Sequence, residues 1–380
     1  MKILVTNNSH KSLVPLLPSD VKTLLENKHE IFFTKGIGNS IYINDHEYIK
    51  LGAKIVHKLN ANFLKQMDVV LSYDLLNNKF YKTNNHNQVF WCHGFLVNHP
   101  KELLNLLQNK NTIISSEAIN EDGLYPYSMA YEQVKGVYSV NLACNYLAKT
   151  DKNPKASGLS ICPVSELKSK TTFLILNHSY AGYYAAKTAL GLGANVIYLD
   201  SDVNTLKDLK KNNEFKVLVE TLNGSIKFDT ASFDNLKQYA KQANVLIATN
   251  PILTQKTRTR LTLEILNNIQ PGGVYLDLGA ESGLSSEASQ QPNKENKHPD
   301  ITNNLKQIVL DNIPLMFPLT MSQVFSNLNK KYLLELNNST NVIDQIKKHP
   351  VLSKAVITNN GNLTNADLAK SLKLNYQKLK

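Results

Sequence analysis

TTFLILNHSYAGYYAAKTALGLGANVIYLDSD, residues 171–202, decides the fold class of this 380-residue chain. An apolar strand runs into a short turn, an alanine-rich segment with helical spacing follows, and a second apolar strand ends at Asp200. This order of strand, helix and strand is the opening unit of a doubly wound α/β sheet. The stretch therefore predicts a Rossmann-type domain, whose ligand, a dinucleotide, would lie at the carboxyl ends of the strands.

The chain after Asp200 continues the same alternation. We expect a helix to Asn213, a further helix at 234–242, and strands at FKVLVETL (215–222), NVLIATN (244–250) and GVYLDLGAE (273–281). The segment 285–304 is polar and has no apolar periodicity, so it is predicted to be a long loop that is either functional or mobile.

The N-terminal part shows a second alternation of strand and helix. A strand at 3–6, a helix at 18–28 and a strand at 30–36 begin it, and further strands are predicted at 68–74, 87–94 and 112–117. A long helical pattern at 129–149 then leads into a loop, where we expect the domain to change. The predicted fold class is α/β with two domains, each with a mainly parallel sheet flanked by helices.

Composition excludes several classes of protein. Hydrophobic residues make up 42% and charged residues 19%, and no apolar run approaches the ~18–20 residues of a membrane helix. We expect no direct membrane insertion and, without a signal-peptide pattern, a cytoplasmic location. The net charge of +11 comes from scattered lysines, so nucleic-acid binding is not predicted. Cys92, Cys144 and Cys162 form no CxxC pair, and no metal site is expected.

The turn between strand and helix is the predicted cofactor site. In the dinucleotide fingerprint G-x-G-x-x-G, the three glycine places are here Asn177, Ser179 and Gly182. Gly182 still permits close packing of helix and strand, and Asn177 tolerates the left-handed conformation of a tight turn. The Cβ of Ser179 stands where the backbone normally approaches a pyrophosphate, although its hydroxyl and His178 could contact a phosphate instead. The alternative is a nucleotide-type fold that has lost its nucleotide.

Asp200 supports a cofactor independently of the turn. A carboxylate at the end of the second strand accepts hydrogen bonds from both ribose hydroxyls and repels a 2′-phosphate. The residue therefore favours NAD over NADP. In the alternative interpretation, Asp200 only caps the helix that follows.

The sequence resembles the family of alanine dehydrogenases and of the soluble nucleotide-binding subunit of nicotinamide nucleotide transhydrogenase. The resemblance is carried by LLPSDVKTLLENKHEIFFTKGIGNS, AAKTALGLGANVIYLD, LDLGAESG and IPLMFPLTMSQVFSNLNKKY. It implies a substrate domain built from both chain ends, 1–128 plus 322–380, with the Rossmann-type domain, 129–321, inserted between them. It also implies a homo-oligomer that binds a small amino or keto acid, and the apolar face of the 129–149 helix is consistent with assembly.

The resemblance also indicates which functional side chains are missing. Leu13 stands at the position of a carboxylate-binding arginine, and Ser72 and Asp74 stand where a lysine is expected. Phe95 lies opposite the catalytic histidine, and His93 comes two residues earlier. Since residues 93 and 95 share a face in a strand, His93 is a candidate acid or base, or else a structural histidine.

Two polar positions are retained relative to the family. Glu281 stands where its members have a carboxylate near the nicotinamide, and Asn327 matches an asparagine before the closing helix. The predicted catalytic residues are thus His93, Glu281 and Asn327, although a carboxylate such as Glu281 can also be only a cap. Leu319 replaces a second arginine of the family.

Two hypotheses about function remain open. In the first, the protein is an NAD-dependent oxidoreductase of a divergent small amino or keto acid, in which His10, Lys11, His93 or Lys35 replace the missing cations. In the second, it is a pseudoenzyme that keeps the fold as a nucleotide- or protein-binding module; transhydrogenase subunits of the family dock on a membrane partner. A working cleft would keep polar residues that converge on one point, whereas a retired cleft would be filled by apolar side chains such as Leu13, Leu319 and Phe95.

Overall fold

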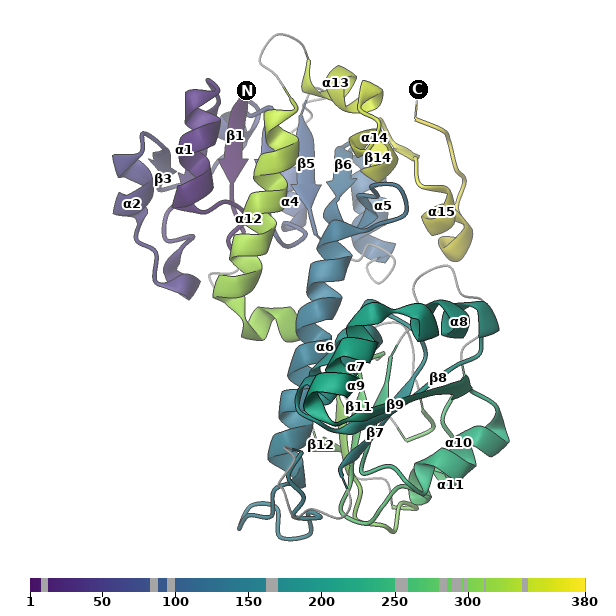
Figure 1. The fold of residues 1–380 in the computed structure, drawn as a ribbon. Coiled ribbons are helices and arrows are strands. Elements are labelled where there is room, and N and C mark those ends of the chain that lie inside the picture. Colours follow the sequence, from purple (N-terminus) through teal and green to yellow (C-terminus); the bar gives the residue numbers. More distant parts are fainter. Residues whose placement is uncertain are drawn as a thin grey trace. The chain divides into compact units, whose positions relative to one another are not determined.

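The computed structural model describes eleven stretches of the chain: residues 1–7, 13–82, 88–93, 100–161, 170–249, 259–279, 286–288, 295–296, 299–310, 312–336 and 341–379. The chain divides into unit 1, Met1–Tyr131 with Pro314–Lys380, and unit 2, Glu132–Ile313 (Figure 1). The first division falls inside the long helix α6 (Pro126–Leu147), three residues beyond the expected boundary. The second precedes the expected boundary by eight residues.

Unit 1 contains an eight-stranded sheet in the order β15-β14-β6-β5-β4-β1-β2-β3. Its first six strands in the chain are parallel to one another: β1 (Lys2–Val5), β2 (Glu30–Thr34), β3 (Lys54–Val56), β4 (Val69–Leu71), β5 (Val89–Cys92) and β6 (Thr112–Ser115). The C-terminal part adds β14 (Val356–Asn359) and β15 (Asn362–Leu363), which pair antiparallel. Strands from both ends of the chain therefore share the sheet of unit 1.

Helices cover this sheet because its strands are apolar on both faces. Leu4, Val70, Phe90 and Ile113 belong to one buried cluster. The helices are α1 (Pro18–Glu26), α2 (Asp45–Lys50), α3 (Ala61–Leu64), α4 (Asn78–Tyr81), α5 (Pro100–Gln108), α12 (Pro318–Leu334), α13 (Val342–Lys348), α14 (Leu352–Ala355) and α15 (Ala366–Leu372). No helix within the described ranges is long and apolar enough to cross a membrane.

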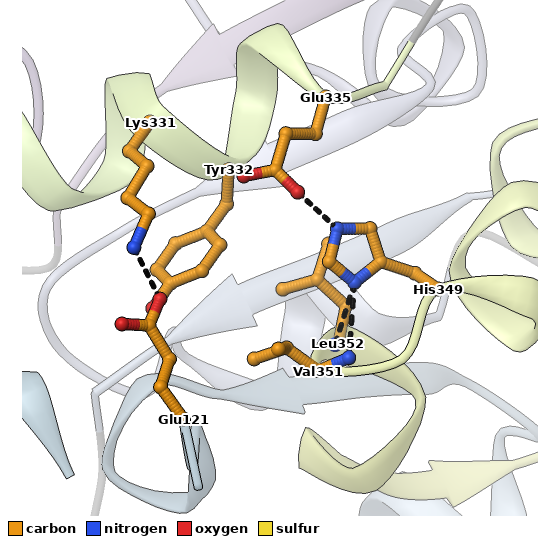
Figure 2. A network of polar contacts seen from close by, with 7 residues as sticks. All are labelled: Glu121, Lys331, Tyr332, Glu335, His349, Val351 and Leu352. Atoms are coloured by element: carbon orange, nitrogen blue, oxygen red, sulfur yellow. Dashed lines mark hydrogen bonds and ion pairs between the residues drawn. The ribbon is translucent and has the colours of Figure 1, made fainter. Parts of the chain in front are cut away.

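A histidine at the end of α13 organises the start of α14 (Figure 2). His349 Nδ1 accepts hydrogen bonds from the backbone N–H groups of Val351 and Leu352, both at 3.1 Å, and its Nε2 lies 2.7 Å from Glu335 Oε2. Since Nδ1 accepts, the proton of the neutral imidazole is on Nε2 and is donated to Glu335. The C-terminal segment is thereby tied to α12.

The second polar contact in Figure 2 joins the two parts of the chain that make up unit 1. Glu121 Oε1 accepts hydrogen bonds from the Lys331 ammonium group and, at 2.7 Å, from the Tyr332 hydroxyl. These hydrogen bonds, first that from Lys331 and then that from Tyr332, lower the pKa of the Glu121 carboxyl. The ion pair is thus a source of pH-dependent stability.

We expect Glu121→Gln to lower the melting temperature of the protein near neutral pH and to matter less in acid. Because the folded pKa lies below the unfolded value of about 4.3, the contribution of Glu121 is complete above that value and is lost as the pH falls through the folded pKa. Thermal unfolding followed by circular dichroism between pH 3 and pH 7 measures the difference. Glu26→Gln is the matched control, because Glu26 is 63% exposed and lies 3.9 Å from Lys22. If the difference in melting temperature between Glu121→Gln and the unaltered chain stays constant down to pH 3, the ion pair is not the source of this pH dependence.

Unit 2 contains a seven-stranded sheet in the order β12-β13-β11-β10-β7-β8-β9. Six strands are parallel to one another: β7 (Thr172–Leu176), β8 (Asn195–Asp200), β9 (Ser225–Thr230), β10 (Val245–Ala248), β11 (Val274–Asp277) and β13 (Lys306–Val309). The short β12 (Glu295–Asn296) is antiparallel. The helices are α7 (Tyr180–Gly191), α8 (Val203–Lys211), α9 (Asn213–Leu222), α10 (Phe233–Ala240) and α11 (Leu263–Asn267). This topology confirms the predicted doubly wound fold.

One predicted strand is wrong. The segment 215–222 forms most of helix α9, and the strand that follows β8 in the sheet is β9 instead. The β-branched run in this segment favours a strand locally, but Asn212 caps the helix by accepting a hydrogen bond from the N–H of Glu214 at 2.8 Å. Packing against α7 then decides the conformation, since Phe215 is 1% exposed and its ring centroid lies 4.9 Å from that of Tyr183.

Helix α6 approaches α7 unusually closely at Gly136. A Cβ placed on Gly136 would lie 2.3 Å from the carbonyl oxygen of Ala181 and 3.0 Å from the backbone N of Ala185. Neither neighbouring atom belongs to a flexible side chain, so the helices would have to separate to admit a methyl group. The beginning of α7, which carries the predicted cofactor turn, is therefore held in place by a glycine on α6.

We expect Gly136→Ala to lower the free energy of unfolding by about 1–3 kcal/mol, the usual cost of overpacking. Chemical denaturation of the full chain measures it. Gly191→Ala is the control, because Gly191 also lies in a helix but a Cβ there meets no atom within 4 Å. That variant should be neutral or stabilised by up to about 1 kcal/mol. Equal effects of the two substitutions would show that the close approach of α6 and α7 does not matter.

Candidate functional site

The topological switch point of unit 2 lies between β7 and β10, where a dinucleotide would be expected. Asn177 follows β7 in the expected left-handed conformation, with φ of 69°. Its Nδ2 donates to the carbonyl oxygen of Thr249 at 3.3 Å, and Thr249 Oγ1 donates to the carbonyl oxygen of Asn177 at 2.6 Å. Both residues are buried, at 4% and 1% exposure. The two strand ends are thus joined directly across the switch point.

Ser179 is the N-cap residue of α7. Its Oγ accepts the hydrogen bond of the Gly182 N–H at 3.0 Å, and the residue is 2% exposed. This N–H is one of the helix N-terminal donors that would otherwise be available to a phosphate. A Cβ on Gly182 would lie 2.7 Å from the hydroxyl of Tyr198, so the expected role of this glycine in close packing is confirmed.

The ring of His178 contacts the hydroxyl of Tyr198. Its Nδ1 lies 3.1 Å from Tyr198 Oη, and burial lowers the pKa of the imidazole, while the charge of Asp200 acts in the opposite direction. The pKa therefore lies below its ordinary value, and the ring is neutral at pH 7. A neutral imidazole bound to Tyr198 brings no positive charge to a phosphate.

Asp200 is completely buried at the end of β8. Its Oδ2 accepts a hydrogen bond from the backbone N–H of His178 at 2.5 Å, and its Oδ1 accepts one from the N–H of Asp202 at 2.7 Å. The cap of α8 is not Asp200 but Asp202, whose Oδ1 accepts from the N–H of Asn204 at 2.9 Å. Asp200 therefore joins the turn after β7 to the turn after β8.

These groups do not fit a dinucleotide in the arrangement seen here. The serine hydroxyl already caps the helix, both oxygens of the buried carboxylate accept backbone hydrogen bonds, and Asn177 and Thr249 bridge the switch point. A pyrophosphate would compete with Ser179 for the Gly182 N–H, and a ribose would meet no exposed oxygen on the fully buried Asp200.

In unit 1, His93 follows β5 and is 4% exposed. Its ring stacks on Tyr73, with centroids 5.5 Å apart, and meets Phe325 edge to face at 5.0 Å. Its Nδ1 lies 3.7 Å from Glu117 Oε2, close enough to stabilise a protonated imidazole. The histidine is thus placed among aromatic rings with one carboxylate beside it.

The switch point of unit 1 lies between β1 and β4. Here Asn7 joins two loops: its Nδ2 donates to the carbonyl oxygen of Leu13 at 2.6 Å, and its Oδ1 accepts from the N–H of Tyr73 at 2.9 Å. Leu13 is fully buried, so its side chain packs inside unit 1. Leu319, in the first turn of α12, is 50% exposed and does not fill a closed site.

Two serines of α12 that were not predicted from the sequence bind the loop after Leu13. Ser322 Oγ accepts the N–H of Val14 at 2.9 Å, and Ser326 Oγ accepts the N–H of Leu17 at 2.7 Å. All of these residues are buried. Asn327, the predicted catalytic residue of this helix, is exposed. Small polar side chains at i and i+4 within an apolar helix face are the pattern that would have indicated the buried pair.

Four predicted positions cannot be placed. Glu281, Phe95, His10 and Lys11 lie outside the described residues, as do residues 285, 289–294 and 297–298 of the predicted 285–304 loop. Within the ranges that the structure covers, no group of three or more His, Cys, Asp or Glu side chains could hold a metal ion. In each unit, the candidate site therefore consists of the described groups at its own switch point.

Comparison with known proteins places these features in a family. The pattern described as "Alanine dehydrogenase/PNT, N-terminal domain" matches residues 7–127, and that described as "Alanine dehydrogenase/PNT, C-terminal domain" matches residues 140–366. An alanine dehydrogenase of Staphylococcus saprophyticus is 25% identical over 376 residues, which are 98% of this chain and 96% of the relative.

Solved structures agree with the fold. An L-alanine dehydrogenase superposes with a TM-score of 0.81 at 19% identity, covering 98% of this chain and 99% of the other. A transhydrogenase from Sinorhizobium meliloti superposes with a TM-score of 0.72 at 16% identity, covering 97% of this chain and all of the other. At these identities the structural likeness establishes the fold.

Proposed function

Because this chain belongs to the alanine dehydrogenase/PNT family, whose domain patterns match both parts of it, we propose that it keeps the scaffold of an NAD-dependent oxidoreductase as a non-catalytic binding module. The observation that carries the proposal is the buried Asp200, whose two oxygens both serve the protein backbone. A ribose-binding carboxylate needs an oxygen that faces the ligand. In unit 1, the buried Leu13 supports the same conclusion for the substrate carboxylate.

The proposal predicts that NADH binds about 10²–10⁴-fold more weakly than it binds the alanine dehydrogenase of S. saprophyticus. Two hydrogen bonds to a charged group are worth about 1.5–3 kcal/mol each, and about 1.4 kcal/mol corresponds to a factor of ten. Calorimetric titration of both proteins under the same conditions measures the ratio. Comparable affinities, or sub-micromolar binding of NADH to this chain, would refute the proposal.

A substitution at Ser179 tests whether the cap of α7 prevents NADH binding. Ser179→Gly removes the hydroxyl that caps α7 and frees the N–H of Gly182, while glycine in place of serine at an N-cap costs only a few tenths of a kcal/mol. We expect this variant to bind NADH more tightly than the unaltered chain. No gain in affinity would show that the crevice is closed by other groups, such as Asn177 and Thr249.

The second candidate function is a nicotinamide-dependent oxidoreductase of a small amino or keto acid other than alanine. The observation that favours it is His93, buried after β5 with Glu117 3.7 Å from its ring. A histidine beside a carboxylate can accept a substrate proton and be stabilised as the imidazolium. Turnover of any amino or keto acid with NAD(H) that His93→Gln abolishes would favour this candidate over the binding module.

A further inference from the structure

A cavity of about 500 Å³ opens in unit 1 at the carboxyl ends of β1, β2 and β3. Thr6 follows β1, Thr34 ends β2 and Val56 ends β3, and all three line it. This edge of a parallel sheet is where α/β proteins bind ligands, and the volume lies in the ~300–1,000 Å³ range of small-molecule pockets. Four described positions that the family resemblance assigns to the substrate, residues 13, 72, 74 and 93, do not line this cavity.

The loop that forms one wall is held by backbone hydrogen bonds. The Lys35 N–H donates to the carbonyl oxygen of Val56 at 3.1 Å, and the Gly36 N–H lies 2.9 and 3.1 Å from the two carboxylate oxygens of Asp45. Gly36 has φ of +74°, and a Cβ there would lie 2.9 Å from Asn39 Nδ2. Backbone N–H groups therefore hold this wall in position, and none of these hydrogen bonds involves the side chain of Lys35.

The ionisable side chains that line this cavity are basic ones. Lys35 and His57 are the ionisable side chains among them, and both are exposed. Among the described residues that line this cavity there is no carboxylate. The adjoining cavity, which shares Lys35 with this one, is lined by Asp45 and Glu47. The Asp45 carboxylate accepts a hydrogen bond from the Gly36 N–H, and the Glu47 carboxylate accepts one from the Asn44 N–H. A ligand in this cavity therefore meets the Lys35 ammonium group, the His57 imidazole and no described acid.

The rest of the lining combines apolar and neutral polar side chains. Ile37, Val56, Leu59 and Phe80 supply aliphatic and aromatic surface. Thr6, Asn7, Thr34 and Asn39 supply hydroxyl and amide groups. Such a lining suits a ligand that has an apolar body and one polar end.

We propose that this cavity binds a small organic acid, with its carboxylate at Lys35 and His57 and its apolar body against Val56 and Phe80. Lysine and protonated histidine form charge-assisted hydrogen bonds with a carboxylate, whereas an inorganic anion leaves the apolar wall in contact with water. The site does not depend on NAD binding or on catalysis. It holds whether the protein is a binding module or an enzyme.

The test uses the full chain and phenylacetate as the probe, with its neutral amide, phenylacetamide, and inorganic phosphate as comparisons. We expect saturable binding of phenylacetate, followed by the ¹H–¹⁵N resonance of Gly36 and by calorimetry. Phenylacetamide and phosphate should each bind at least about tenfold more weakly, because one lacks the charge and the other the apolar body. Phosphate binding as tight as that of phenylacetate would overturn the proposed role of the apolar wall.

Substitutions test whether Lys35 and His57 bind the carboxylate of phenylacetate. Lys35→Gln and His57→Gln should each weaken phenylacetate binding about tenfold, the effect of losing one charge-assisted hydrogen bond. Lys50→Gln is the matched control, because Lys50 lines the adjoining cavity and not this one. All three side chains are exposed, so the melting temperature should not change. No saturable binding at 10 mM (about −2.7 kcal/mol), or an equal loss in Lys50→Gln, would overturn the proposal. A separate NADH titration tests the proposed function independently.

Discussion

L-Alanine oxidation by this protein is expected to be at least about 10⁴-fold slower, in kcat/KM, than oxidation by the S. saprophyticus alanine dehydrogenase assayed beside it. A positioned acid or base contributes roughly 10²–10⁴ in rate, and each charge-assisted bond to the substrate about 1.5–3 kcal/mol. The cationic groups that the family resemblance implies for the carboxylate are missing here. Leu13 is fully buried, and Ser72 Oγ donates at 2.7 Å to the backbone carbonyl of its neighbour Asp74.

The candidate proton acceptor, His93, is buried. His93 is 4% exposed and packs against Tyr73 and Phe325, so it has little access to a substrate amine in this arrangement. Reduction of NAD followed at alkaline pH with excess L-alanine measures the rate. Turnover close to that of the relative, abolished by His93→Gln, would show that the site has been rebuilt from other residues.

Restoring single cations is not expected to rescue the reaction. Leu13→Arg places a guanidinium at a position with no solvent exposure, and an unpaired buried charge destabilises the fold strongly. We therefore expect this variant to be unstable rather than active. Recovery of alanine oxidation in a stably folded Leu13→Arg protein would contradict the view that the side chain belongs to a closed core.

Asp200→Ala is expected to lower the free energy of unfolding by about 3–6 kcal/mol, a large part of the stability of a typical domain. The substitution removes the acceptor of two backbone N–H groups, those of His178 and Asp202, in a fully buried place. Denaturant unfolding of the full chain measures the loss. Asp202→Ala, which removes an exposed helix cap next to it, should cost much less.

A second variant separates this structural role from recognition of a nucleotide. Asp200→Asn keeps one acceptor oxygen but places an N–H₂ group against one of the two donors, so it should also be destabilised. If Asp200 instead serves a ribose, Asp200→Asn should fold normally and change the ratio of NAD to NADP affinity. That result would contradict the structural assignment and return Asp200 to the role predicted for it from the sequence.

The fold could be predicted from the sequence because it depends on patterns that are local. Apolar strands alternating with helical spacing indicate two α/β sheets, and the strand at 172–176 with its turn and helix identifies the doubly wound one. Asn177 and Gly182 were also predictable, since backbone conformation and the absence of a Cβ are properties of single residues. The segment 215–222 was not, because contact between α9 and α7 outweighed its local preference for a strand.

The state of the candidate site was decided only by the tertiary structure. Asp200 at the end of a strand is compatible with a ribose ligand or with a structural anchor, and the difference lies in a hydrogen bond from His178, 22 residues earlier. Likewise, the hydroxyl of Ser322 holds the N–H of Val14, 308 residues away in the chain. The spacing of Ser322 and Ser326 indicates that they are buried, but no local pattern indicates the distant backbone groups that they bind. Burial of a carboxylate likewise depends on everything packed around it. The sequence by itself therefore determined which groups stand at the strand ends, and only the folded chain determined whether those groups face a ligand or one another.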